Sequence, residues 1–128
     1  LRYTILDGTD LQDSLLFGTR FCNASMKGAD LRYSLIHESD FTGADLSGAK
    51  FTATEAHAGV PGYNKWIVTG YQRVSFRGAN LSGADFLRSS IRDADFTGAV
   101  IDGAVFQRGQ LPQYNLSPEQ LQVINIFG

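Results

Sequence analysis

The sequence has few of the residues that several common classes of protein require. Among 128 residues there is one cysteine, Cys22, which excludes an internal disulfide and a zinc site built from several cysteines. No apolar run approaches the roughly 20 residues that a membrane-spanning helix needs. Lys and Arg number 11 against 13 Asp and Glu, and this net charge of −2 argues against a polycation that binds nucleic acid directly. At this length we expect a single domain spanning 1–128.

Large apolar residues recur at every fifth position through most of the chain. From Leu1 to Phe51 this column holds only Leu, Ile, Met and Phe, and it resumes from Phe76 to Leu111. A second column, mostly Ala, Ser and Thr, lies two residues before each large residue. Glycine often stands two residues after the large residue. A period of five matches neither a helix nor a strand, so the chain must bend in every unit, where glycine is most useful.

Tandem units such as Gly-Ala-Asp-Leu-Arg at 28–32 and Gly-Ala-Asn-Leu-Ser at 78–82 closely resemble the pentapeptide-repeat family, with its A(D/N)LXX consensus. The resemblance covers 1–53 and about 74–111. It implies an all-β fold, a right-handed quadrilateral β-helix in which four units form one square coil and both columns point inward. Equivalent side chains would then stack about 4.8 Å apart in successive coils, with Phe21 beneath Phe41.

Residues 54–73 interrupt the repeats. Pro61-Gly62 is a turn signal, and Pro61 and Trp66 fit the large column poorly. We expect a loop inserted at one corner of the square, which leaves the register of the repeats intact. The alternative is a degenerate coil.

The C-terminal segment 116–127 has the pattern of a helical cap. Ser117 suits an N-cap position, Pro118 the first helical position, and Gln120 completes a capping box. A short α-helix over about 118–125 would cover the last coil with Leu121 and Ile124. No comparable cap precedes Leu1, and the sequence starts mid-repeat without Met. This suggests a fragment, a processed product, or a first coil covered by a partner.

The sequence indicates no catalytic residue, metal site or cofactor. Cys22 lacks a neighbour that would activate it as a nucleophile. His37 and His57 lack the supporting carboxylate cluster of a metal site. The repeat itself explains many carboxylates, because Asp commonly stands just before the large residue, where solvation and turn hydrogen bonding are its expected roles. These aspartates are Asp30, Asp40, Asp45, Asp85 and Asp95. We therefore expect a protein that is not an enzyme.

The resemblance also suggests an alternative function, since some members mimic duplex DNA and bind DNA gyrase, which gives quinolone resistance. About 90 repeat residues would form a rod of roughly 22 Å, a length of DNA that carries about 13 negative charges. A net charge of −2 makes this chain a poor mimic. The inserted loop keeps the alternative of a topoisomerase-binding regulator open.

Apolar side chains in outward positions favour a scaffold for protein–protein interaction, with an unidentified protein partner. The pattern places four such candidates on one face near the N-terminal end, namely Leu15, Phe17, Leu35 and His37. The alternative is that this patch packs under a preceding segment or the insertion. The inserted loop carries three further candidates, namely Tyr63, Lys65 and Trp66.

Other properties stay open at this stage. An uncovered coil end also allows a homodimer. The compartment is undetermined, with the cytoplasm slightly favoured over the periplasm and the thylakoid lumen that the resemblance also allows.

Overall fold

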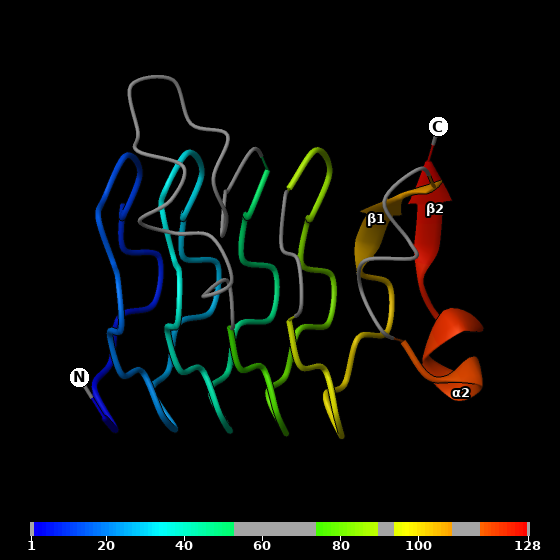
Figure 1. Ribbon diagram of the computed structural model, residues 1–128, viewed down its shortest axis with the longest axis horizontal. Helices are drawn as coiled ribbons and strands as arrows, with labels where there is room; N and C mark the ends of the chain where they lie inside the picture. The colour runs from blue at the N-terminus through cyan, green and yellow to red at the C-terminus, as the bar shows by residue number, and fades with distance from the viewer. Residues whose placement is uncertain (1, 53–73, 90–93, 109–115, 128) are drawn as a thin grey trace.

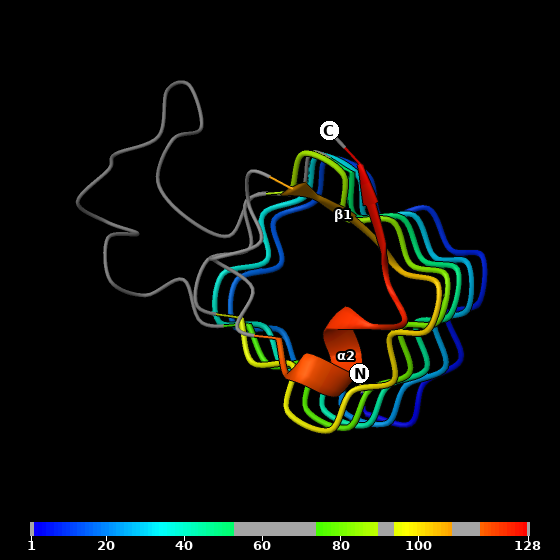
Figure 2. The ribbon, with the colours of Figure 1, turned by 90° about the vertical axis from the view of Figure 1, so that its right-hand side faces the viewer.

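The computed structural model describes residues 2–52, 74–89, 94–108 and 116–127. These residues form four-sided coils stacked along one axis, with the N-terminus at one end and a small C-terminal unit at the other (Figure 1). Seen along the axis, the coils superimpose on a square outline (Figure 2). The fold is a right-handed quadrilateral β-helix, which confirms the expected fold class.

Parallel β-bridges join residues that lie one coil apart. Ser25 is bridged to Ile5 on one side and to Asp45 on the other, an offset of 20 residues each time. The Ser25 N–H donates to the Thr4 carbonyl at 2.9 Å, and the Ser25 carbonyl accepts from the Leu6 N–H at 2.6 Å. The backbone polar groups of one coil are therefore satisfied by the next.

The register of the repeats is kept across the interruption. Asp40 is bridged to Ser75 and Lys50 to Asp85, an offset of 35 residues, which exceeds the usual 20 by 15. Because 15 is a multiple of five, large and small columns continue unchanged on both sides. The expected insertion at 54–73 lies outside the described residues.

A tight turn closes each side of the square. The first coil runs to Arg20 and the second from Phe21 to Asp40, as the 20-residue offset implies. In the first coil the Thr9 N–H donates to the Leu6 carbonyl at 3.1 Å, and Gly8 between them has φ +67°, as a type II turn requires. Positive φ angles recur at this position in the described coils, which confirms the predicted bends. Six of these positions carry residues other than glycine, which the pattern of glycines did not predict: Tyr3, Asp13, Asn23, Tyr33, Glu38 and Arg88.

Gly43→Ala is expected to destabilise the protein more than Gly28→Ala. Both positions are left-handed, with φ +69° and +66°, so each alanine incurs a strain of about 1–2 kcal/mol. An added Cβ at Gly43 would also overlap Oδ1 of Asn23, so that this side chain would have to move, whereas the space at Gly28 is open. Urea denaturation measures the difference. In an Asn23→Gly background the two substitutions should cost the same, and a persisting difference would contradict this explanation.

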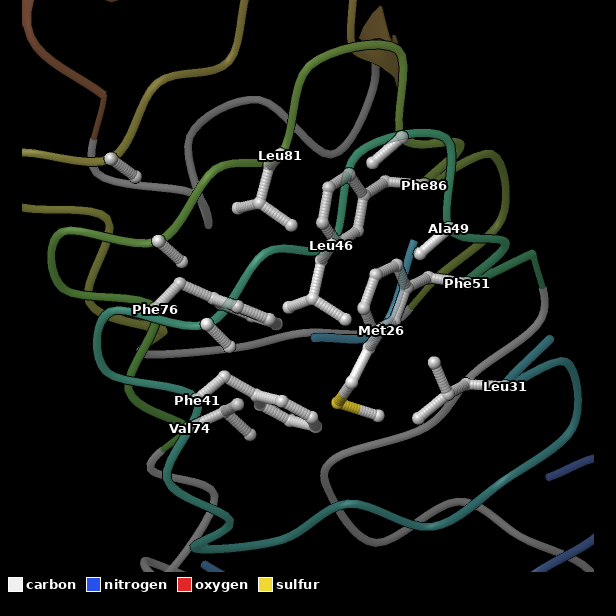
Figure 3. Packing of buried hydrophobic residues seen from close by; sticks show 14 of the residues in the cluster. Met26, Leu31, Phe41, Leu46, Ala49, Phe51, Val74, Phe76, Leu81 and Phe86 are labelled. Carbon is white, nitrogen blue, oxygen red and sulfur yellow. The ribbon is translucent and has the colours of Figure 1, made fainter. Parts of the chain in front are cut away.

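The core is built from stacked aromatic rings inside the tube. In one column, Phe41 stacks on Phe21 at a centroid distance of 4.9 Å and on Phe76 at 5.2 Å, which confirms the predicted ladder. A second column places Phe86 4.7 Å from Phe51, and the two columns meet edge to face (Figure 3). The other two sides contribute residues such as Leu46 and Ile36, which are also fully buried, so side chains from all four sides fill the interior.

The last coil is closed by a short helix and a strand. Strand β1, Val105–Gln107, pairs in parallel with β2, Asn125–Phe127, and helix α2, Pro118–Leu121, precedes β2 (Figure 2). The predicted capping box is confirmed, because the Ser117 side chain accepts from the Gln120 N–H while the Gln120 side chain accepts from the Ser117 N–H. The Gln120 amide also donates to the carbonyls of Phe96 and Ala99 at 2.9 and 3.1 Å.

The helix is shorter than the predicted 118–125. The Val123 carbonyl accepts from the Gly103 N–H at 2.7 Å, and the Asn125 N–H donates to the Ala104 carbonyl at 2.8 Å. These bonds to the last coil draw the chain out of the helix. As a result Leu121 is 43% exposed, and Ile124 packs against the core without it.

Candidate interaction surface

The aspartates that precede the large residues are engaged in turns. Oδ1 of Asp40 accepts from the Thr42 N–H at 2.9 Å, and Oδ1 of Asp95 accepts from the Thr97 N–H at 2.9 Å. Asp30, Asp45 and Asp85 accept in the same way. These bonds confirm the predicted turn role of all five.

The electrostatics of Asp30 and Asp95 do not suit general acid catalysis. The side-chain hydrogen bond from Arg32, whose guanidinium lies 2.7 Å from Asp30, lowers the pKa of Asp30 below its ordinary 3.8. The hydrogen bonds of Thr97 lower the pKa of Asp95 in the same way. A general acid at neutral pH needs the opposite shift, so these groups act as fixed charges on the outer walls.

Cys22 does not have the environment of an activated nucleophile. Burial, followed by the neighbouring Asp40 carboxylate, raises the pKa of its thiol. Within the described ranges no group of three or more His, Cys, Asp or Glu could hold a metal ion. His57 lies outside those ranges. Of the helices that the structure describes, none has the length and apolarity needed to cross a membrane.

The four outward candidates do not form one exposed patch. Leu15 is 66% exposed and Phe17 43%, but Leu35 and His37 are buried, at 6% and 4%. The expectation that all four face solvent was therefore wrong for the latter two. They lie in the second coil, where Leu15 is bridged to Leu35 and the Phe17 ring lies 5.0 Å from the His37 ring, so the first coil covers one side of each. We call Leu15 and Phe17 the first-coil patch.

Two other apolar side chains of the first coil are exposed and were not predicted from the sequence. Ile5 is 78% exposed and Tyr3 is 70% exposed. Ile5 occupies the slot just before a large residue, as Leu15 does, and this equivalence would have identified it. The loop candidates Tyr63, Lys65 and Trp66 lie outside the part of the chain that the structure describes.

Solved structures with related folds are pentapeptide repeat proteins. One from the cyanobacterium Nostoc PCC 7120 is 20% identical with a TM-score of 0.54, covering 92% of this chain and 84% of its own. One from the thylakoid lumen of Arabidopsis thaliana is 20% identical with a TM-score of 0.48, and the match covers 91% of this chain and 71% of the Arabidopsis chain. QnrB1, a plasmid-mediated fluoroquinolone resistance protein, is 17% identical with a TM-score of 0.33, covering 97% and 58%.

Sequence comparison places the chain in a family. Comparison with curated protein sequences gives no match. The profile of the family described as pentapeptide repeats matches in eight copies over residues 1–32, 28–55 and 72–108. Since these matches span well over half of the sequence, and the large and small columns fill the tube in the way the repeat requires, the chain belongs to the pentapeptide-repeat family.

Proposed function

We propose that this protein is a non-enzymatic scaffold that binds a protein partner through its outer walls. The exposure of the first-coil patch carries the proposal. Core packing accounts for the inward side chains and turn hydrogen bonding for the outward aspartates, but neither accounts for a leucine that is 66% exposed on a wall. Burying such a side chain completely contributes roughly 1.5–3 kcal/mol, enough for an anchor residue.

The stacked coils suit this role because they hold the wall in place before a partner arrives. Leu15 is bridged to Leu35 one coil further on, and the adjacent Leu16 N–H donates to the Leu35 carbonyl at 2.8 Å. A backbone restrained in this way loses little conformational freedom on binding, so less of the contact energy is offset.

The double substitution Leu15→Ser and Phe17→Ser is expected to weaken partner binding about tenfold or more, because burial of both side chains is lost. Binding is compared by affinity capture from an extract of the source cells, followed by titration of the captured protein. The matched control is Val100→Ser. It removes an apolar side chain that is 49% exposed and lies in the last coil, far from the first-coil patch. Equal loss in the control would contradict a specific role for the first-coil patch.

The inserted segment provides a second contact in this proposal, through Tyr63, Lys65 and Trp66. Deleting residues 56–70 removes 15 residues, the excess of the 35-residue offset over the regular 20, so the columns on either side should stay in register. We expect the circular dichroism spectrum to be unchanged and partner binding to be lost. Unfolding of the deletion variant would instead mean that the segment belongs to the stack.

Topoisomerase regulation is the competing function, and the wall charges argue against it. Duplex DNA carries one negative charge per 1.7 Å and no positive charge of its own. On the walls of this protein, by contrast, cations lie beside the carboxylates: Lys27 is 3.8 Å from Asp45, and Arg77 is 3.6 Å from Asp95. We expect supercoiling by purified DNA gyrase to be unaffected at micromolar protein, with or without a fluoroquinolone. Inhibition of the gyrase, or its protection from the drug, would favour the competing function.

A further inference from the structure

Two neighbouring corners of the tube differ in the residues at their left-handed positions. At one corner these positions are all glycine, with φ between +66° and +73°: Gly8, Gly28, Gly48, Gly83 and Gly103. At the next corner the equivalent positions 13, 33, 53, 88 and 108 carry no glycine. Tyr33 and Arg88 have φ of +61° and +57° there, a conformation that neither residue favours. Strained residues of this kind cluster at functional sites, so this corner is a candidate contact.

The guanidinium of Arg88 makes no polar contact within the fold. It forms no ion pair or hydrogen bond with any residue of the described ranges. Three other cations do pair, and they lie 3.8, 2.7 and 3.6 Å from an aspartate, namely Lys27, Arg32 and Arg77. Asp85, three residues before Arg88, accepts instead from the Leu87 N–H and is bridged to Lys50. The positive charge of Arg88 can therefore pair with a group from outside the chain.

A surface cavity of about 190 Å³ opens at this corner, lined by Leu87, Arg88, Gln107 and Phe127. It lies where two coils diverge. In the first coil the corner is closed by backbone, because the Asp13 N–H donates to the Arg32 carbonyl at 3.1 Å. The Arg88 N–H donates instead to the side-chain Oε1 of Gln107 at 3.2 Å. Gln107 is the last residue of strand β1, whereas its equivalent Leu87 lies in a turn, so a side chain spans the gap between the two backbones.

The lining of the cavity suits a single acidic side chain. The guanidinium of Arg88 offers donors in a planar fork that matches a carboxylate, and Leu87 and Phe127 are apolar. Pockets for drug-sized ligands measure about 300–1,000 Å³, so this smaller cavity fits a side chain better than such a ligand. Arg108, which follows Gln107 directly, likewise forms no ion pair within the described ranges and adds a second positive charge.

We propose that the cavity at Arg88 receives a glutamate or aspartate side chain of the protein partner, while apolar groups beside that carboxylate pack on Leu87 and Phe127. The proposal rests on the scaffold function proposed above and gives the chemistry of one contact. The corner borders the side of the tube that carries Leu15, which follows the corner residue Asp13 by two positions. Three coils separate Asp13 from Arg88, about 14 Å along the axis, so one partner can contact both places.

Titration with two short peptides tests the preference for a carboxylate. The probes are acetyl-Leu-Glu-Leu-amide and its glutamine counterpart, which has nearly the same shape without the charge. Nitrogen-15 NMR follows the side-chain signals of Arg88 and Gln107. We expect saturable shifts with the glutamate peptide and about tenfold weaker binding of the glutamine peptide, because hydrogen bonds to charged groups contribute more than neutral ones. Equal affinities, the absence of saturable shifts, or tighter binding of inorganic phosphate than of the glutamate peptide would overturn the proposal.

Glycine substitutions separate recognition from a structural role. Arg88→Gly relieves the left-handed strain, so the melting temperature should not fall, while binding of the glutamate peptide should weaken about tenfold or more. Tyr33→Gly is the matched control, because it relieves the same strain at the same corner but does not line the cavity, and it should bind the peptide like the unaltered chain. A lower melting temperature for Arg88→Gly alone, or equal peptide affinities for the two variants, would show that Arg88 is not a recognition residue.

The peptide titration is independent of the first-coil patch. Neither Leu15 nor Phe17 lines the cavity. A negative titration would therefore reject the contact at Arg88 and leave the scaffold function to the test of the first-coil patch.

Discussion

Phe76→Ala is expected to destabilise the protein by about 3–5 kcal/mol, the range for an aromatic residue removed from a packed core. Phe76 is fully buried and stacks at 5.2 Å on both Phe41 and Phe96. Phe51 and Phe86 contact it edge to face at 5.6 and 5.9 Å. Each of these neighbours is anchored to its own coil by the backbone ladder, so they cannot collapse into the space left by the ring.

Urea denaturation measures this effect. The matched control is Phe127→Ala, which removes a phenylalanine that is 54% exposed on β2 and should change the free energy of unfolding by less than about 1 kcal/mol. Total stabilities of domains are about 5–15 kcal/mol, so the Phe76 variant should be close to unfolding at moderate temperature. A loss equal to that of the control would mean that Phe76 does not lie in the core.

Ala84→Leu is expected to cost about 1–3 kcal/mol by overpacking, and it represents every position of the small column. Ala84 is fully buried, its N–H donates to the Leu81 carbonyl at 3.0 Å, and its carbonyl accepts from the Val105 N–H at 2.9 Å. With the backbone held on both sides, the wall cannot move outward to admit three more carbon atoms.

Thermal unfolding measures this cost. For a domain of this size the melting temperature should fall by about 4 °C for each kcal/mol lost. Val100→Leu, which enlarges a side chain that is 49% exposed, should leave the melting temperature nearly unchanged. An unchanged melting temperature for Ala84→Leu would show that the tube has unfilled space beside the small column.

The five-residue pattern was sufficient to predict the interior of the protein. It identified the large and small columns, and the stacking of Phe21 beneath Phe41 follows from a 20-residue coil. The prediction worked because each inward position meets the same neighbours in every coil. The capping box was predictable for a similar reason, since Ser117 and Gln120 interact locally.

Features that depend on particular neighbours were not predictable in the same way. Leu35 and His37 occupy outward positions, yet they are buried, which the repeat alone cannot indicate. The helix ends at Leu121 because β2 pairs with the last coil, a contact between distant segments. Tyr33 and Arg88 adopt left-handed backbone conformations because the stack imposes the turn, although neither residue favours it.

The first coil emerges as the part of the molecule with the most unexplained surface. Its side chains include Ile5 and Leu15, which are among the most exposed apolar groups of the described residues.

Cysteine accessibility along one side and corner of the tube tests the central claim, that two positions in every five point into a filled interior. Single cysteines are introduced at successive positions from 79 to 86, omitting the turn position 83, in a Cys22→Ser background. Their rates of alkylation are then measured under native conditions. We expect strong protection at 79, 81, 84 and 86, where the native residues are fully buried, and clearly faster reaction at 80, 82 and 85, where they are only half-buried. Protection that alternates strictly, or that follows a helical period, would contradict the four-sided tube.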